Sequence, residues 1–214
     1  LLARGARFRA PAMVLREAAL AASGLLDTRI GGKPVYPYQP DDVWETLAIT
    51  KERDFTYPAS TGADLYRRSL YTFWRRTIGP ANIFDASNRQ TCKVRASTTS
   101  TPLHALTTLN DPTWAEAARV LAARSMEASS VADARVTFAF RRVLGRKPTA
   151  NEVTTLRRMQ ERQLKFYQAD AKAAAQVVAV GAAPRSPQLA VTEHAALTAV
   201  CLALFNLDEA LTRE

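Results

Sequence analysis

The chain has 214 residues, of which 47% are hydrophobic, and this length and apolar content suffice for one domain with a buried core. Its 29 lysines and arginines against 20 acidic residues give a formal charge of +9, which permits an anionic partner such as nucleic acid or an acidic polysaccharide. No lysine-rich run or nucleic-acid motif is present, and the longest apolar stretch, 195–207, is shorter than the roughly 18 residues of a membrane-spanning helix. We therefore expect a soluble domain without a membrane span.

The first part of the chain is predicted to hold one regular helix followed by irregular structure. Apolar residues recur at helical spacing over 8–23, and the glycine that follows is placed to end this helix. Three prolines within 31–40 remove backbone donors, which favours an extended loop that carries aromatic side chains. After this loop, Asp41 or Asp42 can cap a short helix.

The segment 65–77 fits two interpretations. It is rich in aromatic and β-favouring residues, as a strand would be. A helix, in contrast, would place Tyr66, Leu70 and Phe73 on one face. We favour a short strand or an irregular segment, which could pair with 91–94 as a β-hairpin.

From Thr101 onward the sequence predicts a bundle of helices with short connections. Most of these helices have a capping hydroxyl or carboxylate at their start, and Gly145 is a stop signal. The predicted helices are 102–109, 112–127, 132–144, 150–168, 171–180 and a last one that begins at 186–187 and runs past 207. The expected fold class is mainly α, a helical bundle with an irregular N-terminal half. We expect one domain, 1–214, in which 1–100 form the first helix and an irregular arm and 101–214 form the bundle.

Motifs for catalysis or metal binding are scarce. The sequence has no nucleophile elbow, no phosphate-binding loop, no dinucleotide fingerprint and no Cys-x-x-Cys pair. His104 lacks a companion at metal-binding spacing, and His194 directly follows Glu193, so these two side chains diverge on a helix. We therefore predict packed or surface histidines, no metal and no cofactor in this chain. Cys92 and Cys201 could form a disulfide or remain two thiols, and their spacing does not decide between these.

The densest polar cluster lies in the middle of the chain, where arginines alternate with aromatic residues. Such a cluster can bind phosphate, sulfate or carboxylate groups, or stack on sugars and bases. It can also pack internally through cation–π contacts and salt bridges, and we favour this structural interpretation. If a helix began at Asp85, this carboxylate would cap it and pair with Arg89. The candidate site residues are Arg67, Arg68, Arg75, Arg76, Asp85, Arg89, His104, Asn110 and Asp111.

Several stretches of the sequence occur in the order found in a known family. They are Gly31-Gly32 with Pro34-Val35, the run from Tyr66 to Thr77, Phe84-Asp85-Ala86 with Arg89, Thr101-Pro102-Leu103, Leu109-Asn110-Asp111, Gly145-Arg146 with Pro148-Thr149, and Asn206-Leu207-Asp208-Glu209. In these residues the chain resembles the planctomycete domain of unknown function 1553, also called the planctomycete surface-type domain.

This resemblance implies a large parent protein, often exported, that carries a cytochrome-c-like region and another uncharacterised domain upstream. Haem would belong to that upstream region, and the localisation would be extracytoplasmic. The N-terminus has neither an initiator Met nor a signal-peptide pattern, which is what we expect of a piece cut from a larger protein. The family usually has Pro, Glu, Asn and Gln where this chain has Ser87, Gln90, Ser100 and His104. A shared chemistry that depended on those acidic and amide groups would be missing here. If those groups only cap and pack, Ser and His could substitute.

These observations favour a non-catalytic structural or interaction module that docks onto neighbouring domains of its parent protein. One alternative is part of an enzyme site that acts on an anionic polysaccharide, which the arginine–aromatic cluster would support. A second alternative is nucleic-acid binding through the basic surface, for which net charge is the sole support.

Overall fold

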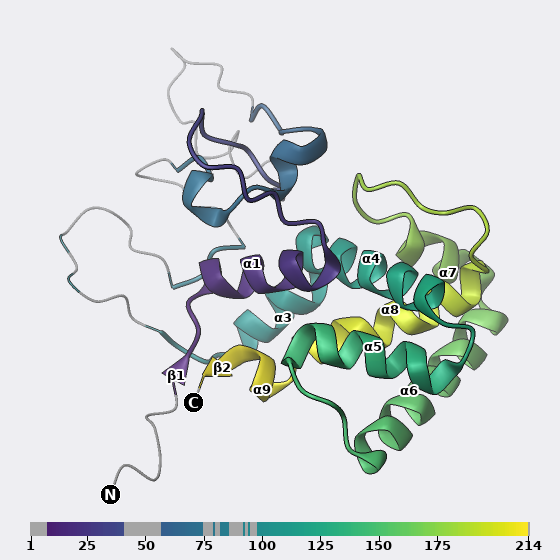
Figure 1. Ribbon diagram of the computed structural model, residues 1–214. Coiled ribbons are helices and arrows are strands. Elements are labelled where there is room, and N and C mark those ends of the chain that lie inside the picture. Colours follow the sequence, from purple (N-terminus) through teal and green to yellow (C-terminus); the bar gives the residue numbers. More distant parts are fainter. Residues whose placement is uncertain are drawn as a thin grey trace, which may run out of the picture.

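The computed structural model describes residues 8–40, 57–74, 79, 82–85, 92, 94 and 98–213, and this part of the chain is mainly helical (Figure 1). Its α-helices are α1 (Ala12–Ser23), α3 (Pro102–Asn110), α4 (Pro112–Ala128), α5 (Ala132–Leu144), α6 (Ala150–Ala169), α7 (Ala171–Val178), α8 (Val191–Phe205) and α9 (Asp208–Leu211). Two short strands, β1 (Phe8–Arg9) and β2 (Thr212–Arg213), pair antiparallel and join the two ends of the described chain. The predicted fold class, a helical bundle with an irregular N-terminal half, is confirmed.

Helices α3, α4, α6 and α7 begin where their capping residues predict. The side chains of Thr101, Asp111, Thr149 and Asp170 each accept a hydrogen bond from a backbone N–H in the first turn of the helix that follows. These N–H groups have no partner inside the helix, so a side-chain oxygen at this position stabilises the helix start. Gly145 ends α5 with φ 73°, a left-handed conformation that glycine adopts without a steric penalty.

Helix α1 is shorter than predicted. The predicted helix begins at Phe8, whereas α1 begins at Ala12, after Pro11. Phe8 and Arg9 instead pair with β2, and the N–H of Ala10 donates to the carbonyl of Leu211 at 2.9 Å. In a helix that began at Phe8, the N–H of Ala10 would lie in the first turn without a partner, whereas here it is bound to the C-terminal end of the chain.

The structure has two helices, α8 and α9, in place of the last predicted helix. The predicted start at 186–187 is also wrong, because α8 begins at Val191. Residues 186–190 form a turn, and Ala190, with ψ 126°, is the extended residue from which α8 starts at Val191. At the other end the chain turns at Asn206, whose side-chain amide donates to the carbonyl of Leu202 at 2.9 Å. The separate short helix α9 begins two residues later.

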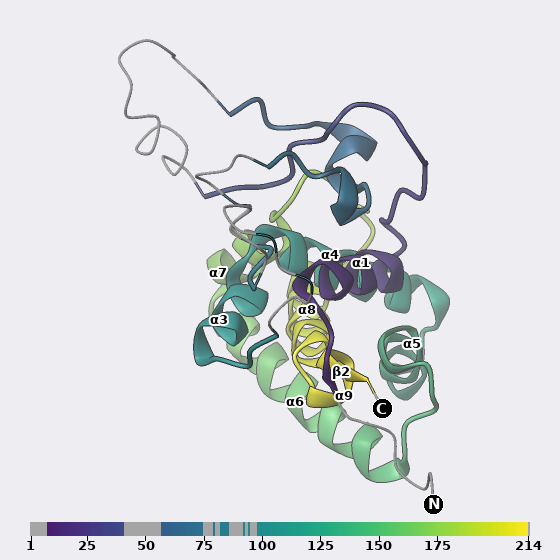
Figure 2. The same ribbon diagram turned by 90° about the vertical axis from the view of Figure 1, so that its left-hand side faces the viewer.

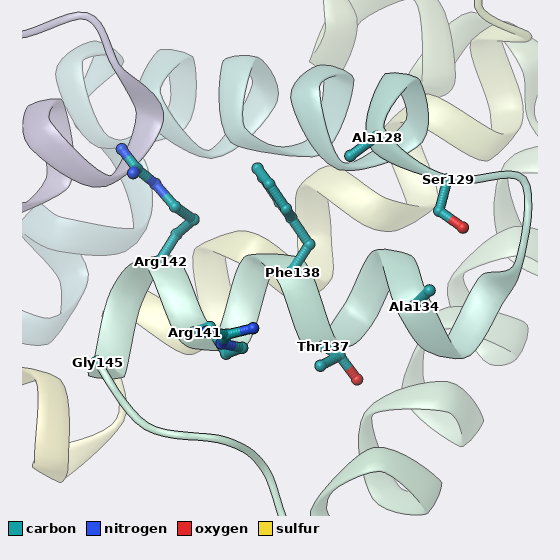
Figure 3. A pocket seen from close by; sticks show the side chains of 8 residues that line it. All are labelled: Ala128, Ser129, Ala134, Thr137, Phe138, Arg141, Arg142 and Gly145. Atoms are coloured by element: carbon teal, nitrogen blue, oxygen red, sulfur yellow. The ribbon is translucent and has the colours of Figure 1, made fainter.

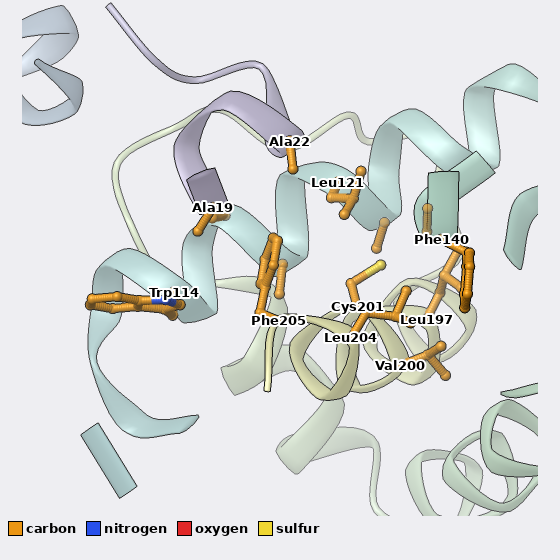
Figure 4. Packing of buried hydrophobic residues seen from close by; sticks show 14 of the residues in the cluster. Ala19, Ala22, Trp114, Leu121, Phe140, Leu197, Val200, Cys201, Leu204 and Phe205 are labelled. Carbon is orange, nitrogen blue, oxygen red and sulfur yellow. The ribbon is translucent and has the colours of Figure 1, made fainter. Parts of the chain in front are cut away.

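The core lies around α8, which α4, α5, α6 and α7 surround, while α1 packs against α4 and α5 (Figure 2). Most residues of helix α8 are buried, which explains why its sequence is apolar almost throughout. Trp114, Leu121, Leu197 and Phe205 pack in this core together with Cys201 (Figure 4). None of the helices that the structure describes combines the length and apolar character that crossing a membrane requires.

The irregular arm consists of the described residues in 25–40 and 57–74, and it lies over α1 (Figure 1). Of the short strand and the irregular segment that we favoured for 65–77, the irregular one is confirmed over the described residues 65–74, which two 3₁₀ turns, Gly62–Tyr66 and Ser69–Tyr71, shape. The backbone of this segment forms parallel bridges to Asp27 and Val35. Residues 91 and 93 of the predicted partner segment and the whole predicted helix after Asp41 lie outside the described residues, so the β-hairpin stays a prediction.

Candidate functional site

Two buried arginines attach the irregular arm to the helical bundle. Arg16 on α1 is fully buried, and its guanidinium donates to the carbonyls of Arg67 and Leu65 at 2.9 Å each and to Ser69 Oγ at 3.4 Å. Burial lowers the pKa of Arg16 to about 10, partly offset by the charge of Asp111, so this side chain stays charged at neutral pH. A buried charge is tolerated here because it is bonded to main-chain oxygens.

Arg67, the first residue of the candidate cluster, performs the next step of the same attachment. It is 4% exposed, and its Nη2 donates to the carbonyls of Arg29 at 3.0 Å and Gly31 at 2.5 Å. Its guanidinium also lies 4.0 Å from the centre of the Tyr71 ring, a cation–π contact. Arg67 is therefore packed internally, as the structural interpretation of the arginine–aromatic cluster predicts.

Arg68 lies at the surface of the arm. Its Nε is 3.3 Å from Glu17 Oε2, and the other oxygen of Glu17 accepts a hydrogen bond from the backbone N–H of Ser69. This contact adds a second, exposed link between the arm and α1. The remaining arginines of the candidate cluster, Arg75, Arg76 and Arg89, lie outside the described residues.

Asp85 and His104 are brought together at the start of α3. The Asp85 carboxylate accepts hydrogen bonds from the backbone N–H of Thr99 at 2.6 Å and from its hydroxyl at 2.8 Å, and Oδ1 lies 3.8 Å from His104 Nε2. The His104 ring stacks on Phe84 at 4.1 Å between centroids. Burial opposes ionisation of Asp85, but the Thr99 bonds and the nearby His104 and Arg9 outweigh it and hold its pKa below the ordinary value.

This arrangement differs from the helix start that we considered at Asp85. The φ of Asp85 is 59°, in the left-handed region, whereas a helix-capping residue is typically extended; residues 86–91, which that helix would occupy, lie outside the described residues. The geometry is also unlike that of an activated nucleophile, because the Thr99 hydroxyl donates to the carboxylate and not to the imidazole. Among the described residues, no three His, Cys, Asp or Glu side chains gather in a way that could hold a metal ion.

Asn110 and Asp111 shape the corner between α3 and α4. Asn110 is exposed, and its amide donates to the carbonyl of Leu106 at 2.8 Å. Asp111 caps α4 by accepting the N–H of Thr113 at 2.8 Å. Burial raises the pKa of Asp111, although the Thr113 bonds and Arg16 act in the opposite direction. The described members of the candidate cluster thus occupy three places: the arm, the start of α3 and this corner.

Two further predictions concern histidine and cysteine. His194 is buried, and its Nε2 lies 2.8 Å from the carbonyl oxygen of Arg119; burial lowers its pKa, so it is a packed, neutral histidine. Cys92 is exposed and Cys201 is buried, and both are free. Of the two alternatives for the cysteines, the structure therefore has two thiols, and burial raises the pKa of Cys201.

Sequence reasoning missed a buried carboxylate. Glu116 on α4 is 1% exposed, and it accepts hydrogen bonds from the hydroxyls of Tyr38 and Tyr66 at 2.9 Å each and from the backbone N–H of Ala183 at 2.6 Å. Arg119 lies 3.6 Å away. Burial together with the charge of Glu116 raises the pKa of both tyrosines, that of Tyr38 to about 12. Glu116 thus binds the arm through Tyr38 and Tyr66 and the 181–187 loop through Ala183, and it connects both to α4.

A second missed feature is the inverted polarity of α3. Leu103, Leu106 and Leu109, here called the leucine face, are 68%, 56% and 41% exposed. The polar residues His104 and Thr108 are 8% and 0% exposed and face the bundle. Residues three apart on a helix lie on one side, so the three leucines form one continuous stripe. A helix with leucines at this spacing usually buries them against the rest of the protein.

A third missed feature is an open groove between α4 and α5, here called the α4–α5 groove. Its volume is about 510 Å³. The lining residues are Ala128, Ser129, Ala134, Thr137, Phe138, Arg141, Arg142 and Gly145. Phe138 and Arg142 rise from α5 into the space between α5, α4 and the end of α1 (Figure 3). The leucines of α3 and the arginines of α5 were visible in the sequence, but their exposure depends on how the helices are placed.

Comparison with known proteins identifies one family. The family model of PSD1, described as a protein of unknown function (DUF1553), matches residues 1–160, from β1 into α6. No curated protein and no solved structure matches the chain. The matched range contains the irregular arm, the leucine face and the α4–α5 groove. Because the match covers most of its length, this chain belongs to the DUF1553 family.

Proposed function

We propose that this domain is an interaction module that docks through the leucine face of α3 onto an uncharged, apolar helix of another domain of its parent protein. The observation that carries this proposal is the inversion of α3, which buries His104 and Thr108 and leaves three leucines in solvent. Fully burying one leucine side chain stabilises by about 1.5–3 kcal/mol, so this exposure is costly unless the stripe is covered in the assembled protein.

The inward polar side chains hold α3 in this orientation. The Thr108 hydroxyl donates to Asn206 Oδ1 at 2.5 Å, and the His104 ring stacks on Phe84 with its Nε2 3.8 Å from Asp85 Oδ1. Turning α3 so that its leucines faced the bundle would break these contacts. The leucine face is therefore a property of the folded domain and does not depend on the partner.

The chemistry of α3 indicates the kind of partner. No Asp, Glu, Lys or Arg lies between Pro102 and Asn110, so charge complementarity does not select an acidic or basic surface there. A leucine stripe at helical spacing fits the grooves of another helix. The stripe is short, and a stable interface between free proteins buries about 800 Å² on each side. We therefore propose a domain of the same polypeptide, because a tether raises the effective concentration.

The test is association between this domain and the rest of its parent protein, expressed separately. Wild-type domain should co-purify with that region, and Leu106→Asp should abolish the association because it places a charge in the apolar contact. Val131→Asp is the matched control, since Val131 is 60% exposed but lies at the start of α5. Association that survives Leu106→Asp, or is absent in the wild type, would refute the proposal.

A further inference from the structure

We propose that the α4–α5 groove is a binding site for a small organic carboxylate with a flat apolar body. This goes beyond docking through the leucine face, because the groove is formed by other helices and takes a different kind of ligand. Its volume of about 510 Å³ lies in the range of about 300–1,000 Å³ that is usual for small-molecule sites.

One continuous face of α5 forms the floor of the groove. Ala134, Thr137, Phe138, Arg141 and Arg142 recur at spacings of three and four residues, so they lie on one side of the helix. The opposite side of α5 contributes to the core through buried residues, namely Val136, Ala139 and Phe140. Helix α5 is thus fixed in the bundle by one side and presents the other side to the groove.

Two arginines supply positive charge at one end of the floor. Arg142 uses Nε and Nη2 to bind the carbonyls of Ala22 and Ala21 at the end of α1, at 3.1 and 2.8 Å, which fixes its guanidinium in place. Its Nη1 has no partner within the described part of the chain. Arg141, next to it, makes no side-chain hydrogen bond or ion pair with any described residue, and no acidic side chain lines the groove. A carboxylate that entered would find two donors and no competing anion.

The rest of the lining is suited to an apolar body. Phe138 is half-buried and offers an aromatic ring. The small side chains of Ala128 and Ala134 leave room for a flat group to lie against this ring. The hydroxyl of Ser129 accepts the N–H of Val131 at 3.0 Å, so its own proton remains available to a ligand oxygen. Since the lining contains more apolar than charged groups, a monoanion with a ring fits it better than a polyphosphate.

The experiment is a titration of the ¹⁵N-labelled domain with 2-naphthoate, followed by the amide resonances of α5. We expect saturable shifts at 134–142 with a dissociation constant on the order of 1 mM, as a ligand of this size typically gives. Neither 2-naphthamide, which has the ring without the charge, nor acetate, which has the charge without the ring, should saturate at the same concentrations.

Arg141→Gln should weaken 2-naphthoate binding about tenfold, because a charge-assisted hydrogen bond is lost while the fold keeps all its contacts. Arg158→Gln is the matched control, since Arg158 is an exposed arginine on α6 and should leave binding unchanged. The proposal is overturned if the amide binds as well as the acid, if the shifts map elsewhere, or if Arg141→Gln binds like the wild type.

Discussion

Arg16 and Arg67 act in sequence: the guanidinium of Arg16 donates to the carbonyl of Arg67 at 2.9 Å, and the guanidinium of Arg67 donates to the carbonyls of Arg29 and Gly31. The first arginine connects α1 to the 65–69 segment, and the second connects that segment to the 29–31 loop. Main-chain carbonyls that a strand would have paired are thus bound by side chains, which explains how an irregular arm can be ordered.

Removing the Arg16 guanidinium should therefore lower the free energy of unfolding more than removing a surface contact of the arm. Arg16→Met keeps most of the volume but leaves the carbonyls of Leu65 and Arg67 without a donor, so we expect a loss of roughly 2–4 kcal/mol in the free energy of unfolding. Arg68→Gln, which removes an exposed ion pair with Glu17, should cost under about 1 kcal/mol. Urea denaturation of both variants measures the difference, and equal losses would contradict the proposed attachment.

Gly181 should tolerate no side chain. A Cβ at this position would lie 2.1 Å from Cδ of Glu116, and the φ of Gly181 is 87°. Gly181→Ala combines this overlap with a left-handed backbone, so we expect a loss above about 3 kcal/mol. Gly145→Ala is the control, since Gly145 also has a positive φ, 73°, but no atom within 4 Å of the added Cβ. Gly145→Ala should lower the free energy of unfolding by about 1 kcal/mol. Thermal unfolding of both variants measures the difference.

The sequence predicted those parts of the fold that depend on neighbouring residues. The Thr149–Glu152 capping box and the Gly145 stop act over three or four residues, and the structure has both. The start of α1 was wrong because the partner of β1 is at the other end of the chain, more than 200 residues away, as the pairing of Phe8 with Arg213 shows. No local pattern carries that information.

The candidate site was harder to predict for the same reason. Arg67 and Asp85 were singled out for their residue types, but their partners are Arg16, 51 positions away, and Thr99, 14 positions away. Glu116 was not singled out from the sequence, although it accepts hydrogen bonds from Tyr38 and Ala183, 78 and 67 positions away. Residue types indicate which chemistry is available, whereas the packing of helices decides which groups meet.

Acid should destabilise the domain through Arg146 and the two carboxylates that it binds, Glu152 at 2.6 Å and Glu209 at 2.7 Å, here called the Arg146 cluster. Hydrogen bonds from Arg146, followed by one from the backbone of Thr149, lower the pKa of Glu152 to about 2, and Arg146 also lowers that of Glu209. A carboxylate with a depressed pKa stabilises the fold fully above its unfolded value, near 4.3, and this contribution is lost as the pH falls toward 2.

Glu152→Gln should accordingly flatten the decline of the urea midpoint between about pH 4.5 and pH 2, because the variant has no proton to take up at this position. Glu127→Gln is the matched control, since Glu127 is exposed and makes no ion pair within the described residues. A Glu152→Gln profile that runs parallel to the wild type would show that the Arg146 cluster does not contribute.

The inversion of α3 makes a prediction about stability that is independent of any partner. Leu106→Gln replaces an exposed leucine that touches little of the bundle, so the free energy of unfolding should change by under about 0.5 kcal/mol. Thr108→Ala, two residues further along the helix, removes a buried hydroxyl and leaves Asn206 Oδ1 without its donor. We expect it to cost about 1–3 kcal/mol. A conventional amphipathic helix would show the opposite order, with the leucine substitution the more damaging, and urea denaturation of the two variants separates these cases. The expected order would mean that α3 keeps its leucines outward for something other than its own fold.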